Sequence, residues 1–161
     1  MNALETLGRT VNTIVERIVF ILGITMAMVV AAQVFSRYVL NHSLFWSEEL
    51  ARYLLIWLTF LGASAAYHRK AHPGIDVLYA RLSAPLQRTA AIATWTASMF
   101  LFGVMIVYGM KFAWFVRYQI SPALYLPKWI VFSIIPLSGM IFLLHAVVSI
   151  GCKIRGNSRD G

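Results

Sequence analysis

The sequence predicts an all-α integral membrane protein, with residues 1–161 forming one membrane domain. Two observations point to this class. Of the 161 residues, 60% are hydrophobic and only 12% are charged, and the mean hydropathy is +0.72. Soluble domains have about 25% charged residues. In addition, the apolar residues gather in four long stretches rather than alternating with polar ones. The composition therefore excludes a water-soluble globule and a disordered chain.

The four apolar stretches are interpreted as transmembrane helices. A bilayer core of about 30 Å requires about 20 residues of helix, and each stretch is close to that length or longer. The first stretch follows Arg17 in the manner of a signal peptide, but it is too long for one and has no clear cleavage site. The predicted spans cover residues 18–36, 50–67, 89–110 and 129–152.

Two further segments have the spacing of amphipathic helices that lie at a membrane surface. In residues 3–17, apolar side chains recur every three or four positions and charged ones lie off that stripe. A second stripe covers residues 75–87, after Pro73 and Gly74. We expect the first of these interfacial helices to lie along the membrane before the chain turns into the first span. The second is expected on the cytoplasmic surface.

The basic residues predict the orientation of the chain. With four spans both termini lie on one side, and that side has nine of the 14 lysines and arginines, against five on the other. Because cytoplasmic loops are enriched in Lys and Arg, the N and C termini are predicted to be cytoplasmic. The formal charge of +8 is accordingly interpreted as membrane topology, and no nucleic-acid partner is expected.

Motifs for catalysis and metal binding are missing from the sequence. The single cysteine, Cys152, allows no internal disulfide and no CxxC pair. There is no HExxH, GxSxG, Walker or glycine-rich dinucleotide motif. No predicted span has an acidic residue in its middle, where ion-coupled transporters usually hold ions. We therefore expect no enzyme activity, no catalytic residue, no substrate site and no cofactor or metal site in this chain.

The densest polar group lies at the start of the second span. Ser47 is placed to cap this helix, and Glu48 and Glu49 follow it. Either acid can pair with Arg52, which lies three or four residues further along the same face. Arg37, at the end of the first span, is expected at the same depth as a further partner. The group is either a solvated helix cap or a polar contact with another subunit or domain.

Two histidines are predicted at the same depth, near the cytoplasmic boundary. His68 ends the second span and His145 lies on the fourth. Two imidazoles on facing helices can ligate a haem iron, which would make the chain the haem-b anchor of a respiratory enzyme. His68 also opens the basic run His68-Arg69-Lys70, where a solvated flank residue is the simpler interpretation. A haem anchor and a self-contained small exporter stay open as alternatives.

Two blocks of sequence carry a resemblance to a known family, the first from Phe35 to Asp76 and the second from Gln119 to Pro136. They resemble the small integral membrane subunit (DctQ-like small permease) of tripartite ATP-independent periplasmic (TRAP) transporters. Together with the four spans and the length, they extend the resemblance over essentially the whole chain. The similarity is clearest in Arg37-Tyr38, in Trp46-Ser47-Glu48-Glu49-Leu50-Ala51-Arg52-Tyr53 and in Gln119-Ile120-Ser121-Pro122-Ala123-Leu124.

The resemblance implies a scaffold role in the bacterial inner (cytoplasmic) membrane. In such systems a periplasmic solute-binding protein captures an organic acid anion, and a large multi-span subunit carries it inward with sodium by an elevator motion. The small subunit braces the large one in a stable complex and meets the binding protein transiently. Sodium is used by the partner, so no cofactor is expected here. Dicarboxylates, sialic acids, keto acids and sulfonates all stay open as substrates.

The resemblance also gives roles to two groups of residues on the periplasmic side. One group is a structural hub that orients the first two spans or contacts the large subunit. The other, in the connection between the third and fourth spans, either fixes that turn or meets the solute-binding protein. The hub consists of Arg37, Trp46, Glu48, Glu49 and Arg52, and the connection contributes Gln119, Ser121 and Pro122.

Overall fold

The computed structural model describes residues 3–69 and 83–157, and within those ranges the regular elements are helices. Four helical stretches in these ranges are long and apolar enough to cross a membrane, which confirms the predicted spans with somewhat different ends: Thr6–Tyr38, Phe45–His68, Pro85–Phe115 and Lys128–Ser149. The helices are α1 (Ala3–Tyr38), α2 (Phe45–His68), α4 (Ala84–Phe115), α5 (Lys128–Phe132) and α6 (Ile134–Asn157).

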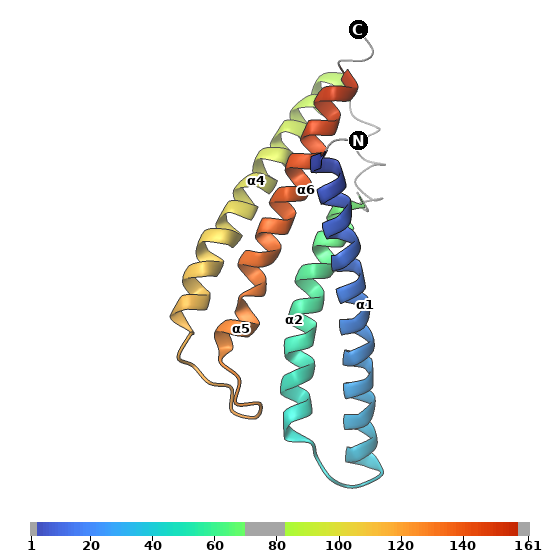
Figure 1. Ribbon diagram of the computed structural model, residues 1–161, viewed down its shortest axis with the longest axis vertical. Helices are drawn as coiled ribbons and strands as arrows, with labels where there is room; N and C mark the ends of the chain where they lie inside the picture. Colours follow the sequence, from blue (N-terminus) through green and yellow to red (C-terminus); the bar gives the residue numbers. More distant parts are fainter. Residues whose placement is uncertain (1–2, 70–82, 158–161) are drawn as a thin grey trace.

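The helices form a row in the order α1, α2, α6, α4 (Figure 1). α1 and α2 are antiparallel neighbours, α4 packs on α6, and α2 and α6 join the two pairs, with α1 also touching α6. The first turns of α1 and the last turns of α6 lie at the same end of the helix axes, which we call the terminal end. The connections 39–44 and 116–127 lie at the other end, the loop end. α2 and α6 are therefore the central helices, and α1 and α4 are the outer ones.

The N-terminal segment differs from the prediction, because α1 is one continuous helix from Ala3 to Tyr38. The predicted turn into the first span is wrong: residues 9–22 contain no proline or glycine to interrupt the helix. The early turns of α1 pack on α6, where a Cβ added at Gly8 would lie 3.3 Å from Val148. With 36 residues, α1 is about 54 Å long and exceeds the thickness of the bilayer core.

The second predicted interfacial helix, 75–87, lies mostly outside the described residues. Residues 84–87 of it form the first turn of α4, which has Pro85 near its start. Proline is well tolerated there because the first turn of a helix has no intrahelical acceptor for its missing N–H. The third span therefore starts earlier than predicted.

Two hydrophobic clusters meet on α6. Where α1, α2 and α6 converge, Val15 and Leu61 are buried with Ile134, which is fully buried. Where α2, α4 and α6 converge, the rings of Phe102 and Phe142 stack with their centroids 4.9 Å apart. α6 thus supplies one wall of both clusters.

Buried serines allow close helix approach around α6. Ser64 of α2 and Ser138 of α6 have no exposed surface. Their hydroxyls donate to the carbonyl oxygens of Leu61 at 2.8 Å and Ile135 at 3.0 Å, in their own helices. Small side chains whose polar atoms are satisfied in this way are typical of helix contacts in membranes.

The fourth span is interrupted at Ser133, between α5 and α6. Pro136 has no N–H to donate to the carbonyl of Phe132, so the regular helical bonding cannot continue through this point. The indole N–H of Trp57 in α2 donates to the carbonyl oxygen of Val131 at 3.2 Å. A neighbouring helix therefore bonds a backbone group beside the interruption, as the bilayer environment requires.

We expect Gly109→Ala in α4 to lower the thermal stability of the purified protein. A Cβ at Gly109 would lie 2.9 Å from Ile135 and Pro136 of α6, and the proline cannot rotate away. Overpacking of this kind costs about 1–3 kcal/mol. The matched control is Gly103→Ala on the same helix, where an added Cβ meets nothing within 4 Å. The control should be neutral or stabilising. Equal melting temperatures for the two variants would contradict the close approach of α4 and α6.

Candidate functional site

The predicted hub is built around Glu49, whose carboxylate reaches from α2 to the 116–127 connection. Its Oε2 accepts the backbone N–H of Ala123 at 2.9 Å and that of Leu124 at 3.2 Å. Its Oε1 accepts the hydroxyl of Tyr53, one turn further along α2. Hydrogen bonds to an ionised carboxylate are stronger than those between neutral groups. Glu49 therefore fastens the connection between α4 and α5 to the first turns of α2.

The connection bonded by Glu49 is a closed turn around Ser121. This serine is buried, and its N–H donates to the carbonyl of Leu126 at 2.9 Å. Its hydroxyl oxygen accepts the N–H of Leu124 at 3.2 Å. The backbone of Tyr125 has a φ of 54°, in the left-handed region that completes the reversal. Ser121 thus lies inside the turn, and its backbone and hydroxyl both bond residues of the turn.

Gln119 and Lys128 close the base of the same turn. The N–H of Lys128 donates to the carbonyl of Gln119 at 2.9 Å, and its ammonium donates to the Gln119 side-chain oxygen at 3.2 Å. Ile120 and Pro127 form an antiparallel bridge between these residues. Pro122 lies exposed at the outer side. The turn therefore leaves Pro122 at the surface.

The other predicted hub residues do not join Glu49. Arg52 pairs with Glu48 at 3.4 Å, as predicted, but both side chains are about two-thirds exposed, so the pair contributes little. The predicted pairing of Arg37 is wrong: among the described residues its side chain has no ion pair or hydrogen bond. Trp46 is 44% exposed. The hub is thus one structural contact, made by Glu49, with four exposed neighbours around it.

Ser47 does not cap α2, because the helix begins three residues earlier than that role requires. The N-cap is Leu44, which makes no side-chain capping bond. Ser47 is buried in the first turn, and its hydroxyl donates back to the carbonyl of Leu44 at 2.7 Å. In the turn before α2, the hydroxyl of Ser36 donates to the carbonyl of His42 at 2.7 Å. Both hydroxyls therefore stabilise the α1–α2 connection.

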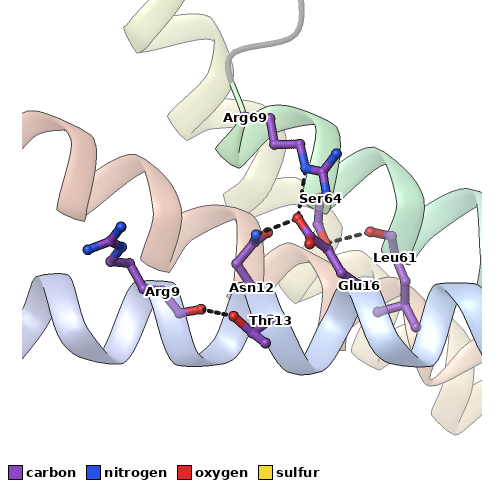
Figure 2. A network of polar contacts seen from close by, with 7 residues as sticks. All are labelled: Arg9, Asn12, Thr13, Glu16, Leu61, Ser64 and Arg69. Carbon is purple, nitrogen blue, oxygen red and sulfur yellow. Dashed lines mark hydrogen bonds and ion pairs between the residues drawn. The ribbon is translucent and has the colours of Figure 1, made fainter.

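A second polar cluster lies at the terminal end, and sequence reasoning missed it (Figure 2). Glu16 of α1 accepts the Nε–H of Arg69 at 2.8 Å and the side-chain amide of Asn12 at 2.7 Å. Arg69 follows the last residue of α2, so the contact ties α1 to α2. The sequence signal that could have revealed this contact is an acid near the start of one span, Glu16, and a base just after the next span, Arg69. Antiparallel helices with a short connection bring such residues to one depth.

The predicted meeting of His68 and His145 occurs in the structure. Their ring centroids are 4.5 Å apart, with the planes tilted by 45°. The rings contact each other directly, so a haem iron between them would require the helices to separate. His145 is 2% exposed, and neither of its ring nitrogens has a hydrogen-bond partner in the described part of the chain.

Asn12 of α1 lies at the level of His145, since Gly8 faces Val148 and Val15 belongs to a cluster with Ile141. The Oδ1 atom of Asn12 is also buried without a partner among the described residues. Two buried side chains at one level of the α1–α6 contact therefore lack full hydrogen bonding, which is costly in a dry interior.

The fold and these contacts define a four-span membrane protein whose polar side chains hold helices and turns together. The sequence matches the family described as tripartite ATP-independent periplasmic transporters, DctQ component, over residues 26–156. The chain therefore belongs to this family of small TRAP transporter subunits. The family and the four apolar spans identify it as a multi-pass protein of the bacterial inner membrane.

Individual relatives agree with this family. The chain is 32% identical over 101 residues to a C4-dicarboxylate TRAP transporter small permease protein of Rhodobacter capsulatus, covering 62% of this chain and 44% of that protein. It is 29% identical over 110 residues to a sialic acid TRAP transporter small permease protein of Vibrio cholerae, covering 68% and 64% respectively. The chain thus spans about half the length of these curated relatives.

A third relative is much longer. The chain is 25% identical over 122 residues to an isethionate TRAP transporter permease protein of Oleidesulfovibrio alaskensis. The match covers 68% of this chain but only 18% of that protein. In that relative, a segment similar to this chain is therefore one part of a much larger polypeptide.

We expect Glu49→Gln to loosen the turn after α4. In glutamine the charge that strengthens both bonds is lost, and the single carbonyl oxygen cannot replace both the acceptor of the Ala123 and Leu124 N–H groups and that of the Tyr53 hydroxyl. Hydrogen exchange in a peptide covering residues 119–126 should accelerate roughly tenfold. Glu48→Gln is the matched control, because Glu48 pairs only with exposed Arg52. Equal exchange rates in the two variants would contradict the fastening role of Glu49.

We expect His145→Leu to leave the protein at least as stable as the wild type. Replacing a buried polar ring that has no bonding partner by an apolar side chain of similar size removes a desolvation penalty of about 1–3 kcal/mol. Thermal unfolding in detergent measures the change. Phe142→Leu, in the stacked pair one helical turn away, is the control and should destabilise the protein. A marked loss of stability in His145→Leu would show that the imidazole makes a bond essential to the fold.

Proposed function

We propose that this chain is a scaffold subunit that braces a large multi-span subunit during uptake of an organic acid anion with sodium. The observation that carries this proposal is the apolar outer surface of the row of helices. Phe20 on α1 is 69% exposed and Phe100 on α4 is 74% exposed. An open row with apolar outer faces leaves broad surfaces for a second membrane protein, which packs there by close contact.

The polar side chains within the spans support a scaffold rather than a transport site. Thr59, Thr96 and Ser138 each donate to a carbonyl oxygen three or four residues earlier in their own helix, at 2.8, 2.9 and 3.0 Å. The hydrogen-bonding capacity of these hydroxyls is satisfied within their own helices, and they do not converge on a shared ligand position. On this proposal, the sodium ion and the substrate bind the large subunit.

The isethionate relative supports the proposal that this chain has a large membrane partner. Joining a segment similar to this chain to a much longer permease polypeptide keeps two functional partners together. We propose that this chain forms the equivalent contact between separate polypeptides, as a stable complex. The large subunit would then move by an elevator mechanism against this fixed row.

The names of three relatives support an anionic substrate, whereas a fourth is named for ectoine, a zwitterionic carboxylate. A C4-dicarboxylate, a sialic acid and isethionate are all anions at neutral pH. We propose an organic acid anion of this kind, delivered by a periplasmic solute-binding protein. The chain's own residues do not select among carboxylates and sulfonates.

The loop end is the proposed periplasmic side, and the termini are proposed to be cytoplasmic. At the loop end, Glu49 would hold the 116–127 turn rigid. Exposed Pro122 would then meet the binding protein at a fixed distance from the membrane. Arg37 and Trp46, which do not join Glu49, would be available to the large subunit. A rigid turn suits a transient contact because little entropy is lost when it binds.

We expect affinity purification of the chain from its native membrane, in mild detergent, to recover a large multi-span protein in equal amount. The two together, reconstituted in liposomes, should take up an organic acid anion only with the binding protein and an inward sodium gradient. Mass spectrometry and a radiolabelled uptake assay measure the two results. Recovery of the chain alone, together with transport by it alone, would favour a self-contained exporter. A Soret absorption band would favour the haem anchor.

A further inference from the structure

A groove of about 580 Å³ runs along the outer side of the α4–α6 contact, towards the loop end. Met110, Ala113 and Trp114 line it from α4, and Trp129, Leu137 and Met140 line it from α5 and α6. Lining residues recur at spacings of three and four, so they share one face of each helix. The groove is within the volume range of sites that hold organic ligands, and its wall is almost wholly apolar.

Arg117 is the charged residue in the lining of this groove. Its guanidinium carbon lies 4.3 Å from the ring centroid of Trp114 and 4.2 Å from that of Tyr118. Its Nη1 donates to the carbonyl oxygen of Trp114 at 3.0 Å. These contacts fix the guanidinium at the rim, and the single bond engages only one of its five N–H donors.

The positive charge of Arg117 has no anionic partner in the described ranges of the chain. The two ion pairs found there are Arg52 with Glu48 and Arg69 with Glu16. Glu49, the other acid near this end, is engaged by backbone N–H groups. A cation at the edge of a bilayer needs an anion or water beside it, so the rim of the groove is suited to a negatively charged group.

Two tryptophans place the rim at the level of lipid headgroups. Trp114 is 68% exposed and Trp129 is 46% exposed, and both lie at the loop end of their helices. Tryptophan is enriched at the membrane–water interface. From that level the groove extends towards Leu137 and Met140, into the depth of the hydrocarbon.

We propose that the groove binds a membrane phospholipid, with an acyl chain along Met110, Leu137 and Met140 and the phosphate on Arg117. In the groove, the acyl chain would contact the apolar wall in place of the tails of other lipids. The planar guanidinium of Arg117 would bind the phosphate through paired N–H donors. A transmembrane helix of a partner would fill the apolar part but leave the guanidinium without an anion. The observations therefore favour a lipid as the occupant.

The test is phospholipid quantification by mass spectrometry on the protein purified from its native membrane with its partners, after extensive detergent washing. The wild type should keep about one phospholipid per chain, and Arg117→Gln should lose most of it. The matched control is Lys111→Gln, because Lys111 lies near the same end over the Tyr108 ring and outside the groove. This control should keep the lipid.

A second variant, Leu137→Trp, fills the groove from a position that is 41% exposed and leaves Arg117 in place. This variant should also release the lipid. It tests the proposal independently if Arg117→Gln loses the lipid only because that variant misfolds. Equal lipid content in wild type, Arg117→Gln and Leu137→Trp would overturn the proposal. Release of a membrane protein by Leu137→Trp, with lipid content unchanged, would overturn it in favour of a helix as the occupant.

Discussion

The arrangement of the chain depends on the packing of α6 between α2 and α4. Lipid tails are as apolar as leucine, so helices in a bilayer associate by close packing rather than by the hydrophobic effect. α6 meets this requirement on two sides: Ser138 is fully buried, and a Cβ at Gly139 would lie 3.0 Å from Ile106 of α4. Because the outer helices each pack mainly on one neighbour, the contacts of α6 set the position of both pairs.

Carboxylates complete this packing at the two ends of the row. At the loop end Glu49 bonds the turn that precedes α5, and at the terminal end Glu16 bonds Arg69 across α1 and α2. A charge is tolerated near the membrane boundary because partners and water are available there. The apolar middle and the polar ends thus perform separate tasks, since the middle sets the helix spacing and the ends fix the connections.

The sequence predicts local and periodic features well, and contacts with distant backbone poorly. Hydropathy finds the four spans, and four-residue spacing finds the Glu48–Arg52 pair. The sequence does not reveal the partners of Glu49 in the connection. They are two backbone N–H groups, 74 and 75 residues away, and no side-chain type marks them. Likewise, an amphipathic stripe in the first residues does not reveal whether the helix continues, and α1 does continue. The alternating direction of the four spans makes α2 and α6 parallel, and this places His68 and His145 at one level, where their rings meet.

On the proposed function, a scaffold beside a moving partner must resist displacement along the membrane normal, and the flanks of these helices are suited to that. α1 and α4 have 36 and 32 residues, about 54 and 48 Å, so their ends extend beyond or tilt within the hydrocarbon core. Arg17 lies in the half of α1 nearer the terminal end, and Arg117 follows the C-cap of α4 at the loop end. Drawing either into the bilayer centre costs about 2.5–3.5 kcal/mol on insertion scales. Sliding of the row in one direction would draw in one arginine and sliding in the other direction would draw in the other, so on the proposed scaffold function these two charges hold the row at a fixed depth.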